Sequence, residues 1–219
     1  MRAEAILLPT LPQSLVGVWL QKVSDAQHHV GLCYFYEGKH RFLHLAWHHK
    51  LTDDEKIDKR RCYAPLSKHE DHQLVIAGFL AVVKDNAGLV PYGIDYESAE
   101  ACIQPDGSLV CLPLGKGLTC ATFVADVLRA AGYRLLDFST WPERPSDAVW
   151  QNWVIQTMKS TGVDPEYIKY IEQDIGAKRL RPEEAAGACV TSPWPVSYSG
   201  VEEVAAKIIG DVEHFSTRT

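Results

Sequence analysis

One cysteine stands where a protein chain can make it a nucleophile. Cys120 follows a turn that contains Gly115 and Gly117, and the apolar residues after it recur at helical spacing to about residue 128. Thr119 directly precedes the cysteine and is suited to cap that helix. Free N–H groups and the helix dipole favour a thiolate there, and a thiolate attacks carbonyl carbon. The competing interpretation is a small apolar residue buried under a helix, which is the commoner environment of cysteine.

Histidine is the natural base for a cysteine nucleophile because its pKa lies near neutrality. The chain has nine histidines, at positions 28, 29, 40, 44, 48, 49, 69, 72 and 214. His29 begins one predicted strand and His44 lies on the returning strand, so strand pairing can bring the two rings together. His28 is an alternative to His29, because a register slip of one residue exchanges the faces of a strand. His48 and His49 could bind a metal, but adjacent strand residues point in opposite directions, so we expect no metal site.

The elements that must position these residues follow from periodicity and turn residues. Two β-rich runs, residues 28–36 and 40–47, flank a Glu-Gly-Lys turn and predict a hairpin. Further predictions are a strand or short helix at 15–20, a polar loop or edge at 50–61, a helix at 72–83 and a short strand at 108–112.

The last third of the chain is predicted to be helical. Capping residues and early prolines indicate helices at about 146–159, 164–175, from 181 onward, and at 201–215. Trp141, Trp150 and Trp153 are expected to pack between these helices and the sheet. The fold class is therefore α+β, with a core at residues 1–136 and a helical C-terminal extension at 137–219 packed on it, as one domain overall.

Composition and charge exclude several classes of function. The 219 residues are 46% hydrophobic and 23% charged, which is typical of a globular domain. The net charge of −6 and the absence of a dense Lys/Arg cluster argue against a nucleic-acid partner. No segment has the length of a membrane span, no signal peptide is evident, and six scattered cysteines indicate free thiols. We expect a cytoplasmic protein without cofactors, while export by a specialised secretion route and the oligomeric state stay open.

Two short motifs resemble the NlpC/P60 papain-like cysteine peptidases. His-Val-Gly-Leu-Cys-Tyr at 29–34, followed by Phe-Leu-His-Leu-Ala at 42–46, is similar to the histidine strands of that family. Thr-Cys-Ala-Thr-Phe-Val at 119–124 is similar to its nucleophile helix. Standard members place the cysteine first, whereas here the histidines precede it by some ninety residues. That order resembles the circularly permuted branch, which includes lecithin–retinol acyltransferase-like and YiiX-like proteins.

The resemblance implies a role for each matching residue. A permuted papain-like fold packs a small antiparallel sheet on the cysteine helix, with Cys120 as nucleophile, His29 as base and His44 as the residue that orients the base. Pro91-Tyr92-Gly93 is similar to the tyrosine segment near the oxyanion site of the family. Tyr92 is therefore one expected oxyanion donor, and the backbone N–H of Cys120, at a helix start, is another.

The implied activity is that of a cysteine peptidase or amidase, a hydrolase that cleaves an amide (peptide or isopeptide) or ester bond through a thioester acyl-enzyme. Peptide, peptidoglycan-like or acyl compounds are the implied substrates. Two alternatives stay open: an acyltransferase or thioesterase that acts on lipid or amine substrates, and a papain-like binding module without catalysis.

Overall fold

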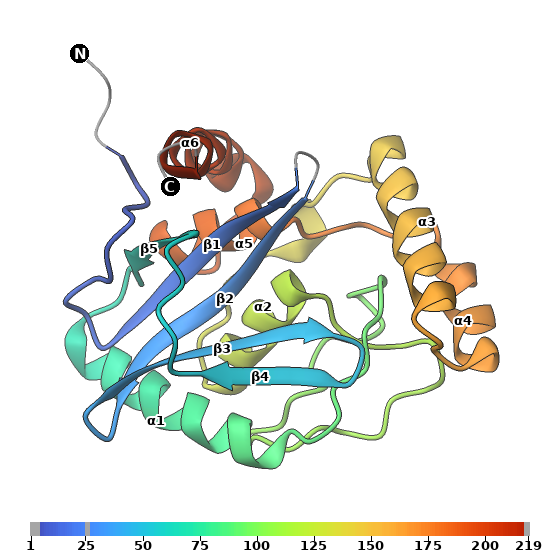
Figure 1. Ribbon diagram of the computed structural model, residues 1–219, viewed down its shortest axis with the longest axis horizontal. Coiled ribbons are helices and arrows are strands. Elements are labelled where there is room, and N and C mark those ends of the chain that lie inside the picture. Colours follow the sequence, from blue (N-terminus) through green and yellow to red (C-terminus); the bar gives the residue numbers. More distant parts are fainter. Residues whose placement is uncertain (1–4, 25–26, 217–219) are drawn as a thin grey trace.

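A five-stranded antiparallel sheet organises the chain in the computed structural model, which describes residues 5–24 and 27–216 (Figure 1). The strands follow the order β4-β3-β2-β1-β5. They are β1 (Val16–Ser24), β2 (Gln27–Tyr36), β3 (Lys39–Trp47), β4 (Lys50–Asp54) and β5 (Arg61–Pro65). Glu37 and Gly38 form the two-residue turn of the β2–β3 hairpin with φ values of 49° and 79°, the left-handed pair that such hairpins favour. The predicted hairpin is confirmed, and the segment before it is a strand.

Six α-helices accompany the sheet in the described part of the chain. They are α1 (Glu70–Asn86), α2 (Cys120–Ala130), α3 (Pro145–Ser160), α4 (Pro165–Ile171), α5 (Pro182–Val190) and α6 (Tyr198–Ser216). All predicted helices are present, although the one expected to reach residue 175 ends at Ile171 and a 3₁₀ turn follows. The strand predicted at 108–112 is wrong, because only an isolated bridge joins Ile103 to Leu109. None of the described helices is long and apolar enough to cross a bilayer.

The two faces of the sheet carry different clusters. Val18, Val30 and Leu43 belong to the main core, which also contains the buried faces of α1, α2 and α5. Alternate residues point the other way, and there Trp19 and Phe42 form a second, smaller cluster with Cys33 and Tyr63. The fold class is thus α+β, with helices packed on the main face of the antiparallel sheet.

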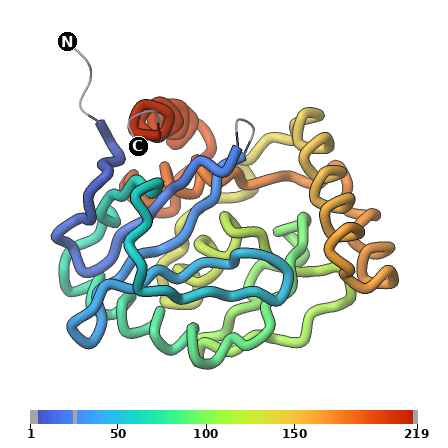
Figure 2. Tube along the Cα trace, viewed as in Figure 1, coloured from blue at the N-terminus to red at the C-terminus, as the bar shows by residue number. Residues whose placement is uncertain are grey.

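The predicted C-terminal extension shares the main core. Figure 2 traces the last third of the chain from α3 and α4 back to the sheet, where α5 and α6 pack beside β1. Leu136 and Val196 form a parallel bridge, so the two ends of this segment are tied together. Its buried side chains in the core include Val154, Met158, Ile168, Ala185, Cys189 and Ile208. Residues after 136 are therefore part of the same packed interior.

Strands β2 and β3 separate at one end, and the site forms in the opening between them. Their ladder runs from Tyr36–Lys39 to Leu32–Leu43 and stops there, although both strands continue. β2 goes on pairing with β1, and β3 goes on pairing with β4. Figure 1 shows the two strands fanning apart with α2 in the opening between them. The start of α2 can therefore reach residues on both faces of the sheet.

Candidate active site

The start of α2 places Cys120 in the first helical turn. Thr119 caps the helix as predicted: its Oγ1 accepts a hydrogen bond from Thr122 N at 3.2 Å. In return, Thr122 Oγ1 accepts from Thr119 N at 2.7 Å, which completes a capping box. Cys120 is only 6% exposed. The residues directly around the cysteine thus fix the start of its helix through local hydrogen bonds.

A pair of histidines lies on the strands beside this helix start. His29 Nε2 and His44 Nδ1 are 2.8 Å apart, and both rings contact Trp19. His44 Nε2 lies 3.8 Å from Asp54 Oδ2, and Asp54 is paired with Arg61 at 3.2 Å. A chain of polar contacts therefore holds the His29 ring in one orientation. Because Nε2 is engaged, Nδ1 is the nitrogen of His29 that is left to accept a proton.

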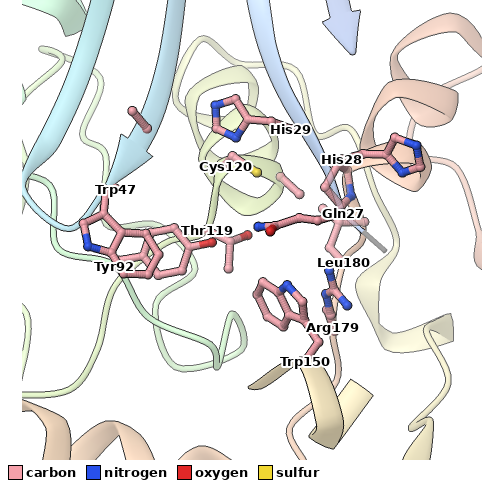
Figure 3. Close-up of a pocket in the computed structure, with 13 residues that line it drawn as sticks. Gln27, His28, His29, Trp47, Tyr92, Thr119, Cys120, Trp150, Arg179 and Leu180 are labelled. Carbon is pink, nitrogen blue, oxygen red and sulfur yellow. The ribbon is translucent and has the colours of Figure 1, made fainter. Parts of the chain in front are cut away.

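Cys120 and His29 line the same small pocket, which has a volume of about 40 Å³. Figure 3 shows the His29 ring next to the Cys120 sulfur, whereas the His28 ring is turned away towards α5. There His28 Nδ1 lies 3.5 Å from Glu183 Oε2. Within the described residues no hydrogen bond joins Cys120 to His29, and such bonds often tighten only when substrate binds. The arrangement favours His29 over His28 as the base.

Gly31 makes room for the histidine pair. Continued β2–β3 pairing would set His44 opposite Gly31, so His29 meets His44 diagonally across this glycine. A Cβ atom at position 31 would lie 2.6 Å from Trp19 Cζ2 and 2.7 Å from His44 Cβ. Such distances are too short for real contacts, so a larger residue must displace Trp19 or His44. The glycine of the His-Val-Gly motif therefore has a packing role in the site.

Substituting Gly31→Ala is expected to lower the free energy of unfolding by about 1–3 kcal/mol, because the methyl group overpacks a buried contact. Urea denaturation measures the loss. Gly78→Ala is the matched control, since Gly78 lies inside α1 with nothing within 4 Å of its added Cβ. That variant is expected to gain about 0.5–1 kcal/mol from helix propensity. Equal effects of the two substitutions would contradict the packing role of Gly31.

Burial makes the resting site neutral. It lowers the pKa of His29 to about 3, with further contributions from His44 and Arg61. It also lowers the pKa of His44 to about 4. Burial raises the pKa of Cys120 to about 11, and the N–H of Val30 and the charge of Arg179 offset this only in part. The prediction that the helix start makes Cys120 a thiolate is therefore wrong for the free protein, because desolvation outweighs the helix start.

Tyr92 reaches the pocket through a loop that is bound to the residues before Cys120. Leu118 N donates to Pro91 O at 3.0 Å, and Gly93 N donates to Leu118 O at 3.3 Å. The backbones approach so closely that a Cβ on Gly117 would collide with Pro91 O. The Tyr92 ring packs against Trp47 and is buried, which raises the pKa of its hydroxyl above the ordinary value. The hydroxyl stays protonated and is therefore a hydrogen-bond donor.

Three residues of the pocket wall carried no recognisable signal in the sequence. Gln27 begins β2, and Figure 3 shows its amide directed towards Thr119. Trp150 and Arg179 come from the C-terminal third, with the Arg179 guanidinium 3.6 Å from the centroid of the Trp150 ring. Trp150 therefore lines the site, and it also packs against the main core as predicted. The packing prediction is wrong for Trp153, which is 47% exposed, and holds for the buried Trp141.

His48 and His49 contact each other and the loop that carries Tyr92. His48 Nδ1 accepts a hydrogen bond from Tyr92 N at 3.2 Å, and the two histidine rings pack against each other. No group of three or more His, Cys, Asp or Glu side chains in the described ranges is placed to hold a metal ion. All six cysteines are free thiols, and Cys111 is the exposed one among them.

Comparison with protein-family models, with curated proteins and with solved structures found no match to this chain. The resemblance to NlpC/P60 peptidases therefore depends on the sequence motifs alone.

Proposed function

We propose that this protein is a cysteine hydrolase of permuted papain-like fold that cleaves an amide or ester bond. One observation carries the proposal: Cys120 begins a capped helix and shares a pocket with His29, whose far nitrogen is bonded to His44. A nucleophile, a base and an orienting group on rigid elements are the parts that such catalysis needs.

The first half of the reaction forms a thioester. His29 Nδ1 takes the thiol proton, and Cys120 Sγ attacks the carbonyl carbon of the substrate. The two charges arise together inside a buried pocket, where their mutual attraction offsets the cost of forming either one alone. The Cys120 N–H, the Tyr92 hydroxyl and the Gln27 amide are the donors available to the oxyanion. When this tetrahedral intermediate collapses, the bond between the carbonyl carbon and the leaving nitrogen or oxygen breaks. The amine or alcohol leaves with the proton from His29.

The second half releases the acyl group. A water molecule gives a proton to His29 and attacks the thioester carbon. The carboxylic acid then leaves, and the proton on His29 returns to the Cys120 sulfur. His44 and Asp54 keep the His29 ring in place through both halves, because His29 must act first as base and then as acid.

Trapping the acyl-enzyme tests this proposal. The protein is mixed with p-nitrophenyl acetate, quenched in acid and analysed by intact-mass and peptide-mapping mass spectrometry. We expect one acetyl group on Cys120 in the parent protein and in Cys111→Ser, which removes the exposed thiol. Acylation that spares Cys120, or that is unchanged in His29→Ala, would instead favour a binding module without catalysis.

Transfer of the acyl group to an amine or alcohol is a second candidate. An apolar groove of about 750 Å³ adjoins the Cys120 pocket and is large enough for an acyl chain. Its wall includes Val23, Val149 and Trp153, and it shares Trp150 and other residues with the pocket. Adding glycinamide to the acylated protein separates the two functions: a transferase forms acetylglycinamide, whereas a hydrolase forms acetate.

A further inference from the structure

Arg179 is a buried cation at the boundary between the Cys120 pocket and the apolar groove, and it lines both. Its side chain is 12% exposed, and its Nε has no hydrogen-bond partner among the described residues. One face of the guanidinium lies on Trp150. A largely buried cation without a close carboxylate partner is costly, so a negatively charged group of a ligand would stabilise it.

The nearest carboxylate is already engaged. Asp147 lies 3.7 Å from Arg179, but it accepts shorter bonds of 2.8 Å from both Arg144 and Arg181. The other acid on this wall, Glu183, is beside His28. His28 Nε2 is a second buried nitrogen without a partner, and His28 also lines both spaces. The lining of the Cys120 pocket therefore contains the Arg179 cation and no carboxylate, whereas the groove beyond it has two arginines and two acids.

We infer that Arg179 binds a free carboxylate of the substrate, next to the bond that Cys120 attacks. This inference rests on the proposed function and narrows its substrate to a class: peptides or acyl-amino acids with a free terminal carboxylate. Two N–H groups of a guanidinium match the two oxygens of a carboxylate, and one face of the Arg179 guanidinium is already occupied by Trp150. Because the groove adjoins Arg179, the residue with that carboxylate carries an apolar side chain that lies against Trp150 and Val149.

Two alkylating agents of similar size test the inference. Iodoacetate carries a carboxylate and iodoacetamide does not, so the ratio of their rate constants at Cys120 reports on carboxylate binding. The thiolate fraction cancels in this ratio at a given pH. Rates are measured in a Cys111→Ser background by mass spectrometry of the Cys120 peptide. We expect Arg179→Met to lower the iodoacetate/iodoacetamide ratio about tenfold or more, as for a lost hydrogen bond between charged groups.

Arg179→Lys keeps the charge but lacks the two-nitrogen edge, and is expected to give an intermediate ratio. Arg60→Met is the charge-matched control, because Arg60 is exposed and pairs only with Asp58 in the described structure. It is expected to leave the ratio unchanged.

A competition experiment on the parent protein, which retains Arg179, does not depend on whether the variants fold. N-acetylphenylalanine is expected to protect Cys120 from iodoacetamide at about a tenth of the concentration that N-acetylphenylalaninamide requires. Equal protection by the acid and the amide, or an unchanged alkylation ratio in Arg179→Met, overturns the inference and leaves Cys120 as a reactive nucleophile. If neither reagent modifies Cys120, the inference and the proposed function fail together.

Discussion

Replacing Cys120 with alanine is expected to reduce turnover of any acyl substrate by at least about 10³-fold, since no thioester can form. His29→Gln is expected to cause a loss of similar size, because a neutral thiol with a pKa of about 11 requires a base at its side. The double variant should be no worse than either single one, as for groups that act as a unit.

Initial rates of ester or amide hydrolysis, normalised to folded protein, measure these effects. Cys111→Ser is the matched control for removing a thiol, because Cys111 is exposed and does not line the pocket. It is expected to keep the parent rate. If Cys120→Ala kept more than a tenth of the parent activity, another residue would be the nucleophile.

Replacing Asp126 with alanine is expected to destabilise the fold by about 3–5 kcal/mol, the usual cost of removing one partner of a buried charged network. Asp126 lies on α2 and is fully buried. Its carboxylate accepts from Ala101 N at 2.9 Å, Ile103 N at 2.7 Å and Arg129 Nε at 2.6 Å. Without it, Ala101 N, Ile103 N and Arg129 Nε lose their acceptor, and the hydrogen bond from Arg129 to Ile103 O is left to hold the loop at 101–103 against the helix.

Urea unfolding, analysed with a common m-value, measures the loss in the free energy of unfolding. Asp85→Ala is the matched control, since Asp85 is exposed at the end of α1 and pairs with Lys84. It is expected to change stability by no more than about 0.5 kcal/mol. A loss below 1 kcal/mol for Asp126→Ala would show that water replaces the carboxylate and that the loop does not depend on it.

The parts of the site that could be predicted from the sequence are those set by neighbouring residues. Thr119 caps its own helix, and Cys120 follows it within one turn. The pairing of His29 with His44 was predicted from one hairpin, although the strands separate there and the contact is diagonal across Gly31. Capping residues and prolines also located the helices of the last third, because these residues act on the helix start beside them.

The remaining features depend on contacts between distant segments, which no local pattern records. The thiol of Cys120 is buried by residues far along the chain, and this burial reverses its predicted charge state. Arg179 lies between Lys178 and Leu180 in a segment without a recognisable motif, and only the packing of the segment before α5 places it at the pocket. β5 has no counterpart among the predicted strands, since its five residues carry arginine and proline at the ends and show their alternation only when paired with β1.

The sheet and the C-terminal third share one interior, but they contribute different parts of the site. Residues 29, 44 and 120 carry the groups of the proposed reaction, whereas Trp150 and Arg179 shape the space beside them. Val23, Val149 and Trp153 line the groove and not the Cys120 pocket, so substitutions there are expected to alter which compounds bind while leaving Cys120 and His29 in place. If the proposed activity holds, changes of substrate in evolution are expected to concentrate on the groove-facing residues of α3, Val149 and Trp153.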